Sequence, residues 1–410
     1  MNAWAFLRLL KQIHGNSIPD LAWIQSQGLL AVKIAQHYAL RVDFLDESVC
    51  RHLSKLFGQA ESVAPENIMP LLKKRVKPDW FDTVKEFRNT PVASASIGQV
   101  HVAKHVDGTP LAVKIVKEDF KPAFLHDLAC LRRLMRVVLF FYPKLRKVFD
   151  PMGVLAHIEE YTLNELDLRN EMEGQAVLTR IANAYRGRHD LSLLRFAHAY
   201  PALSGEGVLV SEFVEGTTFD HLLEAGKLDY DKLLDLFSIH GLFLFGPGVF
   251  HGDLHPGNII LKPDGTLCFL DTGAVSRVGR RIRRGLFRFF MALCDYDYAL
   301  CATRINEMAE IGIDGPRLKQ FEKKFLELYA GFQGKSVSEV SLTRQMMQSI
   351  KLAVNSGMVF EKGMFPIIKS MMYLDGMVLR CKPAANLIRD MKPRIIEFQR
   401  VLADGESPDE

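Results

Sequence analysis

The sequence lacks a long hydrophobic run, paired cysteines and a strong net charge, and each absence excludes a class of protein. No stretch of the 410 residues reaches the roughly 18 uninterrupted apolar residues that a membrane-spanning helix needs. The six cysteines form no C-x-x-C pair, which predicts reduced thiols rather than disulfides or a zinc site. A net charge of +4 is too small for the concentrated basic face of a nucleic-acid-binding protein. We therefore expect no membrane span and no nucleic-acid partner.

The N-terminus does not have the form of a signal peptide. Its apolar run, Ala3 to Leu10, is short and is interrupted by Arg8. We expect a protein that is not secreted and is cytoplasmic, with peripheral association with the inner membrane as the alternative.

Hydrophobic periodicity divides the chain into helical and strand-rich parts. A helical pattern from Asp20 to Phe44 is followed by two more before Asp82. Short and β-branched residues in Val92 to Lys104 and Leu111 to Val116, separated by the turn Asp107-Gly108, predict two or three antiparallel strands. The sequence thus predicts a helical N-terminal segment followed by a small sheet.

The rest of the chain is mostly helical in pattern. Helices are predicted from Asp119 to Lys147 and from Gly153 to Ala182, with strand-like segments at Leu191 to Ala197 and Gly207 to Val214, a helical stretch from Thr217 to Phe250, a hairpin from Ile259 to Leu270 and helices from Arg277 to Leu402. This order predicts a strand-rich lobe with a helical insertion, followed by a helical lobe.

The strongest chemical signal is the segment His251 to Asn258, followed by Asp271-Thr272-Gly273. Phosphoryl transfer from ATP needs metal ligands, a group that orients the acceptor, and cations on the phosphates. Asp253 has the spacing of the acceptor-orienting base, and Asn258 and Asp271 have that of the Mg²⁺ ligands. The alternatives are an unrelated pair of polar turns, or an aspartic protease, which would need an all-β chain and a second Asp-Thr-Gly triplet.

The cation for the phosphates is predicted at Lys114, at the end of an apolar strand. It needs a carboxylate partner on a helix, and Glu165, Asp167 and Glu171 are the candidates. A lysine in this position or a charged helix face is also common without any function.

The loop that should cover the phosphates departs from the glycine-rich pattern of ordinary kinases. Alanine and serine replace glycine, so the loop lacks the free access to positive φ that glycine has, and an altered nucleotide preference is expected. The residues predicted to bind the nucleotide, together with Lys114, are Ala93, Ser94, Ala95, Ser96, Ile97, Gly98, Glu212 and Val214.

With this loop, the chain resembles the UbiB/AarF family of atypical, protein-kinase-like ATPases, from about residue 28 to about residue 291. Lys33-Ile34-Ala35-Gln36 is similar to the family's K-x-G-Q motif, and Glu165-Leu166-Asp167 to its E-x-D motif. The resemblance implies that Lys33 and Gln36, one turn apart on a helix, point towards Glu165 and Asp167 as regulatory residues. It also implies that Glu171 is the partner of Lys114.

Three positions depart from the family or kinase pattern. Ala35 stands where the family usually has glycine, Thr272 where phenylalanine is usual, and Gly252 where many kinases have arginine. The change at Ala35 is expected to alter helix packing, and those at Thr272 and Gly252 put the switching of ordinary kinases in doubt. None of the three removes a metal or phosphate ligand.

The predicted fold is therefore α+β, an atypical protein-kinase-like two-lobed fold with an enlarged, mostly helical C-lobe. Its parts are an N-terminal helical extension (1–88), an N-lobe with a helical insertion (89–216), the C-lobe (217–404) and a disordered tail (405–410). The resemblance implies Mg²⁺ and ATP as ligands, and ATP hydrolysis that supports the metabolism of a quinone precursor or other isoprenoid lipid at a membrane surface.

Two surfaces are candidates for peripheral membrane contact. The apolar stripe Leu134 to Tyr142 is flanked by basic residues, and a second cluster carries Arg277, Arg280, Arg281, Arg283, Arg284 and Arg288. The alternative for the apolar stripe is that it packs in the protein core. The alternative for the arginine cluster is that it is an ordinary solvated helix face. The competing functions are a small-molecule or protein phosphotransferase, and a non-catalytic scaffold that binds nucleotide or lipid.

Overall fold

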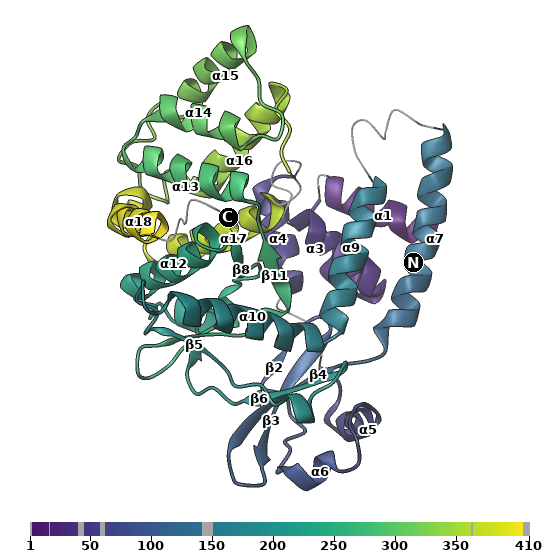
Figure 1. Ribbon diagram of the computed structural model, residues 1–410. Coiled ribbons are helices and arrows are strands. Elements are labelled where there is room, and N and C mark those ends of the chain that lie inside the picture. The colour runs from purple at the N-terminus through teal and green to yellow at the C-terminus, as the bar shows by residue number, and fades with distance from the viewer. Residues whose placement is uncertain are drawn as a thin grey trace. The chain divides into compact units, whose positions relative to one another are not determined.

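The chain folds into two compact units, which are described separately. Unit 1 comprises Met1–Glu173 and Ala197–Phe213, and unit 2 comprises Gly174–Phe196 and Val214–Glu410 (Figure 1). The structure, a computed structural model, describes residues 2–15, 17–39, 45–57, 62–141, 151–361 and 364–404. Helices and antiparallel sheet occur together, which confirms the predicted α+β class.

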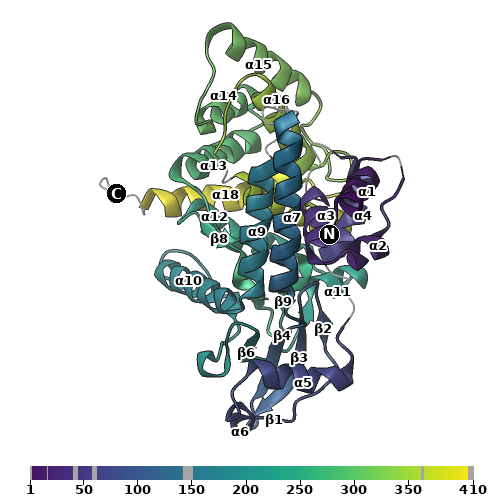
Figure 2. The same cartoon turned by 90° about the vertical axis from the view of Figure 1, so that its right-hand side faces the viewer.

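Unit 1 begins with helices that pack around one apolar core. In both views the longest two lie side by side (Figures 1 and 2). Side chains of Asn2 and Asp20 accept hydrogen bonds from the first turns of the first two helices, at 2.8 and 3.0 Å, and so cap them. The helices are α1 (Ala3–His14), α2 (Leu21–Ser26), α3 (Leu29–Ala39), α4 (Glu47–Leu53), α7 (Phe120–Phe141) and α9 (Pro151–Leu166).

The sheet of unit 1 is antiparallel throughout, in the order β1-β3-β4-β6, with β2 added to β3. Val113 and Ile115 face a second core that includes Trp80, so Lys114 between them lies on the other face. The strands are β1 (Val84–Lys85), β2 (Ala93–Ser94), β3 (Gly98–His105), β4 (Pro110–Val116) and β6 (Val208–Glu212); the shorter helices are η1 (Ser54–Phe57), α5 (Pro65–Arg75), α6 (Trp80–Thr83) and η2 (Pro201–Leu203).

The helix predicted from Gly153 to Ala182 is two helices, α9 and α10 (Arg169–Tyr185). The break falls at Asp167 and Leu168. The carboxylate of Asp167 accepts a hydrogen bond from Arg169 N at 3.1 Å, and Leu168 N donates to Glu206 O at 2.9 Å. A short acidic side chain that bonds to nearby backbone competes with the helix, which a pattern of apolar residues does not reveal. The predicted helix to Lys147 ends as α7 at Phe141, and residues 142–150 lie outside the described part.

Unit 2 combines short strands with a series of helices, of which α13 to α16 pack in succession (Figures 1 and 2). Its strands are β5 (Leu194–Phe196), β7 (Thr217–Thr218), β8 (Val249–His251), β9 (Ile259–Leu261), β10 (Leu267–Phe269) and β11 (Val275–Arg277). Its helices are α11 (Phe219–Glu224), α12 (Tyr230–Phe245), η3 (Pro256–Asn258), η4 (Thr272–Ala274), α13 (Arg280–Cys294), α14 (Tyr298–Met308), α15 (Gly315–Leu328), α16 (Leu342–Asn355), α17 (Met364–Cys381) and α18 (Leu387–Asp404).

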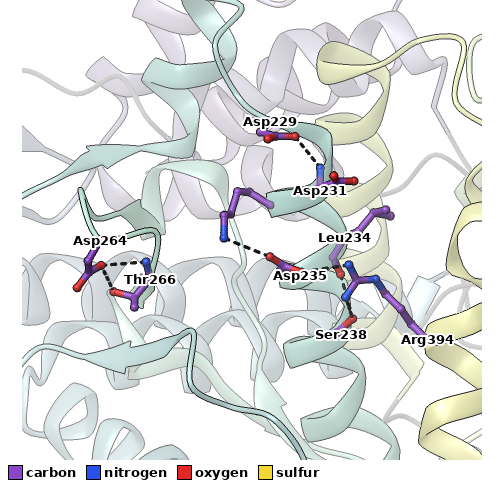
Figure 3. A network of polar contacts seen from close by, with 9 residues as sticks. Asp229, Asp231, Leu234, Asp235, Ser238, Asp264, Thr266 and Arg394 are labelled. Atoms are coloured by element: carbon purple, nitrogen blue, oxygen red, sulfur yellow. Dashed lines mark hydrogen bonds and ion pairs between the residues drawn. The ribbon is translucent and has the colours of Figure 1, made fainter.

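Polar contacts fix α12, the helix that leads into β8. Arg394 of α18 donates to the carboxylate of Asp235 at 3.1 Å and to Ser238 Oγ at 2.8 Å, and Asp229 caps the helix by accepting from Asp231 N at 2.9 Å (Figure 3). The buried His240 packs edge-on against Phe250 of β8, with ring centroids 5.5 Å apart. The start of the segment His251 to Asn258 is therefore held by the core of its own unit.

In the described part of the chain, no helix is both long and apolar enough to cross a bilayer. Residues of the predicted apolar stripe on α7 differ in their exposure to solvent. Leu139 is buried, whereas Val137, Phe140 and Phe141 are 56%, 78% and 69% exposed.

Candidate functional site

In unit 1, Lys114 and Glu171 form an ion pair. The Nζ of Lys114 on β4 lies 2.6 Å from Oε2 of Glu171 on α10, and the two side chains are 19% and 13% exposed. Of the three candidate partners, this is the one that the resemblance implied. The pair places a cation and its carboxylate on the sheet face opposite Val113 and Ile115, as a phosphate-binding lysine requires.

The alanine-rich loop is a tight hairpin that contains no left-handed residue. Ser94 pairs with Gln99 across β2 and β3, and Ala95 N donates to Gly98 O at 2.8 Å. None of the residues 93–98 has positive φ, so alanine fits where glycine was expected. The buried Lys117 donates from Nζ to Ala95 O at 2.6 Å, and thus fixes the turn to the end of β4.

The two predicted motifs of the helical part meet in unit 1 at one residue pair. Lys33, 5% exposed on α3, forms an ion pair with Glu165 of α9, and its Nζ also lies 5.6 Å from the ring centroid of Tyr161. A buried lysine without a partner would be costly, so the carboxylate explains its position.

The other members of these motifs have different partners from those that the resemblance implied. Gln36 donates from Nε2 to Leu56 O at 2.9 Å, and Asp167 binds the side chain of Arg169 at 2.6 Å. The hydrogen bonds from Arg169 lower the pKa of Asp167. The expectation that Gln36 points towards Glu165 and Asp167 is therefore corrected, because the side chain of Gln36 connects α3 to Leu56 of η1 by a hydrogen bond.

The remaining predicted nucleotide residues lie at the end of β6. Glu212 is exposed, and its carboxylate accepts from His198 N at 3.2 Å. Val214 is half-buried and follows in unit 2.

In unit 2, His251 connects the two predicted catalytic segments. Its Nε2 lies 2.8 Å from Leu270 O, and its Nδ1 accepts from Asp253 N at 3.1 Å. Burial lowers the pKa of His251. A neutral imidazole that donates from Nε2 and accepts at Nδ1 satisfies both contacts. His251 therefore ties the backbone of Asp253 to the residue just before Asp271.

Asn258 adds a second connection between the same segments. Its Nδ2 donates to Asp253 O at 3.0 Å, and its own carbonyl accepts from Leu270 N at 2.8 Å. Asp271 then adopts a left-handed conformation, with φ 49° and ψ 57°. Such backbone strain in a non-glycine residue is common at functional sites, and aspartate tolerates it better than most residues.

Gly252 is required by the packing of its neighbours. A Cβ at this position would lie 2.2 Å from Ser276 Oγ and 2.6 Å from Ala274 O, because β8 pairs with β11. No side chain fits here, and this explains physically why the arginine of many kinases is absent.

A residue that the motifs did not reveal contacts Asp253. The Nζ of Lys369 on α17 lies 3.0 Å from Oδ1 of Asp253, and the lysine side chain is 8% exposed. The one available signal in the sequence was a lysine within the apolar periodicity of a helix, between residues such as Ile367 and Leu374, which are buried here.

The donor set in unit 2 fits Mg²⁺. With Nδ2 of Asn258 committed to Asp253 O, the oxygen Oδ1 is the atom that can face a cation, and Asp271 supplies a carboxylate. The described residues contain no cluster of three histidine, cysteine or acidic ligands. Mg²⁺ needs none, because it is commonly held by one or two protein oxygens with phosphates and waters.

Residues 55–305 match the ABC1 atypical kinase-like domain. The chain belongs to this family. The resemblance to UbiB/AarF proteins and the kinase-like fold class are thereby confirmed. Lys33, Gln36 and Lys369 lie outside the matched residues.

Known proteins resemble the chain over most of its length. Proteins named "probable protein kinase UbiB" from Vibrio parahaemolyticus and Glaesserella parasuis are each 26% identical to it; they cover 92% and 90% of this chain and are themselves covered over 69% and 68%. A protein from Clostridium pasteurianum, named for the region 5' of hydrogenase 1, is 23% identical over 91% of this chain and 71% of its own length.

A solved structure shows the shared fold. The Mycobacterium tuberculosis protein Rv3197, in complex with erythromycin, covers 96% of this chain and 95% of that one with a TM-score of 0.56 and 22% identity. At this identity the likeness concerns the fold alone.

Proposed function

We propose that the protein is a kinase-like ATPase that binds Mg-ATP and supports quinone or isoprenoid-lipid metabolism at a membrane surface. The observation that carries the proposal is the hydrogen-bonded frame of unit 2. There His251 and Asn258 together tie Asp253 to Leu270, the residue before Asp271. A frame of this kind keeps an acceptor-orienting carboxylate and metal ligands in a constant geometry, which phosphoryl transfer requires.

Each residue has one role in this proposal. Lys114, oriented by Glu171, binds phosphate oxygens, and the loop 93–98 covers them. Asn258 and Asp271 would hold Mg²⁺, which when bound neutralises phosphate charge. Asp253 orients a water molecule and takes its proton, while the water oxygen bonds to the γ-phosphorus and the bond to ADP breaks.

Hydrolysis is favoured over protein phosphorylation by the helical part of unit 1. The ion pair between Lys33 and Glu165 belongs to the motifs that, by resemblance, regulate nucleotide handling.

Relatives named UbiB point to the quinone pathway. The exposed Val137, Phe140 and Phe141 at the end of α7 are suited to an apolar membrane surface.

The experiment is ATP turnover by the full chain, with and without anionic vesicles and a quinone-precursor mimic. Asp271→Asn is the test variant, because asparagine also tolerates the left-handed backbone but lacks the carboxylate. We expect turnover to fall by about a thousandfold, as losses of electrostatic groups can cost, with an unchanged unfolding temperature. Turnover that Asp271→Asn leaves intact would refute the proposal, and acceptor-dependent ADP release with a phosphorylated product would favour a phosphotransferase.

A further inference from the structure

Lys369 brings a buried positive charge to Asp253 from a distant part of the sequence. The lysine is 7% exposed and lies on α17, and its ammonium is 3.0 Å from the carboxylate of Asp253 in the same unit. Burying an ammonium group is costly even when it is paired. A contact of this kind with the acceptor-orienting carboxylate therefore calls for a functional explanation.

The segment His251 to Asn258 brings no positive charge of its own. It contains no lysine or arginine. At Gly252, Ser276 and Ala274 leave no room for a side chain. A cation beside Asp253 must come from another element, and α17 supplies one.

The position of α17 is fixed by contacts of residues that follow Lys369 along the helix. Tyr373, one turn further along α17, has its ring 5.5 Å from that of His255 in an edge-on arrangement, and the Nζ of Lys369 lies 5.8 Å from the centroid of the same tyrosine ring. Asp375 accepts from Ser341 Oγ at 2.5 Å and from Thr343 N at 3.4 Å, at the start of α16. These contacts set the helix so that Lys369 reaches Asp253 and Tyr373 reaches His255.

We propose that Lys369 is a further catalytic residue: its ammonium orients the carboxylate of Asp253 and neutralises the phosphoryl group as it is transferred. This inference rests on the proposed function. In this step Asp253 takes the proton of the attacking water, the water oxygen bonds to the γ-phosphorus, and the bond to ADP breaks. Cations placed on the transferred group are a main source of rate enhancement in phosphoryl transfer.

The test compares ATP turnover and nucleotide affinity of the full chain with those of Lys369→Met and Lys369→Arg. We expect Lys369→Met to lower kcat by about a hundredfold, the loss typical of one electrostatic group, with ADP affinity unchanged. Lys369→Arg should recover most of this loss, because it restores the charge. The matched control is Lys392→Met, which removes a surface lysine 2.8 Å from Asp295 in the same unit and should leave kcat unchanged.

A purely structural role gives a different result. If Lys369→Met retains wild-type kcat, or loses activity only in proportion to its folded fraction, the inference is wrong. Should Lys369→Met fail to fold because Asp253 is left unpaired, the comparison moves to Asp253→Asn with and without Lys369→Met. We expect the double variant to bind ATP about tenfold more weakly than Asp253→Asn alone, because a charged contact is lost, and to bind ADP equally well. If the double variant loses affinity equally for both nucleotides, or for neither, the inference is wrong.

The outcomes also separate this inference from the proposed function. Wild-type turnover that Asp271→Asn abolishes, but that Lys369→Met does not change, refutes the role of Lys369 alone. Absence of such turnover in the wild type refutes the proposed function, and the role of Lys369 with it.

Discussion

The candidate residues of the two units are held in place by different kinds of interaction. In unit 1, Lys33 and Lys114 are positioned by ion pairs with carboxylates that are far away in sequence. In unit 2, Asp253, Asn258 and Asp271 lie within a short segment whose backbone is positioned by hydrogen bonds from and to side chains and by glycines that admit close contacts. Unit 1 should therefore be most sensitive to changes of charge, and unit 2 to changes of backbone packing.

The largest effect is expected from Gly174→Ala in unit 2. A Cβ at Gly174 of α10 would lie 2.0 Å from Thr272 O, so the segment after Asp271 would have to move. We expect the free energy of unfolding to fall by about 3 kcal/mol, as overpacking against rigid backbone can cost, and ATP turnover to be lost. Chemical denaturation and turnover measure the two effects.

The control for this substitution is Gly187→Ala, just after the same helix. No atom lies within 4 Å of a Cβ there, and the residue has no positive φ. It should be as stable and active as the wild type. Equal stability of the two variants would show that the close packing of α10 on Thr272 is not needed.

The same contrast between units explains what the sequence could predict. The spacing of Asp253, Asn258 and Asp271 identified one local segment, and the structure brings these residues into one hydrogen-bonded frame. Lys114 was predicted as the phosphate-binding cation from its place at the end of an apolar strand. The choice of Glu171 among three acidic candidates came from the family resemblance, because helical spacing alone does not say which carboxylate reaches a given lysine.

Three features escaped prediction because they depend on tertiary contacts. The bend between α9 and α10 turns Asp167 to Arg169, and Gln36 is taken by the carbonyl of Leu56. Lys369 lies far beyond the motif segments, and only the packing of α17 brings it to Asp253.

A medium effect is expected from Lys114→Met in unit 1. The substitution leaves Glu171 as a largely buried carboxylate without its lysine, and we expect a loss of about 2 kcal/mol, between the values for exposed and buried ion pairs. Adding Glu171→Gln removes the second charge and should restore most of the stability, but not ATP binding. Denaturation and ATP titration of the single and double variants measure this; if the double variant is no more stable than Lys114→Met, the pair does not control the stability of unit 1.

The smallest effect concerns pH and the buried histidines of unit 2. Burial lowers the pKa of His240 from 6.5 to about 3, so between these values the unfolded chain binds a proton that the folded chain does not. The free energy of unfolding must then decrease as the pH falls below 6.5, by about 1.4 kcal/mol at pH 5.5 for this one group. Burial also lowers the pKa values of His189, His251 and His255 in unit 2. Among the described residues of unit 1, burial lowers the pKa values of His14 and His101. Unit 2 therefore has more buried histidines of this kind.

Acid should therefore loosen unit 2 before unit 1. Amide hydrogen exchange at pH 5.5 and pH 8 reports the two units separately, and at pH 8 the histidines are neutral in both folded and unfolded chains, which provides the internal control. His240→Gln should reduce the difference in unit 2 between the two pH values, because glutamine takes up no proton on unfolding. If the difference is unchanged in this variant, or if unit 1 exchanges first, groups other than His240 and its buried neighbours govern the acid response. The contrast between unit 1, positioned by ion pairs, and unit 2, positioned by hydrogen bonds and glycines, would then not extend to pH.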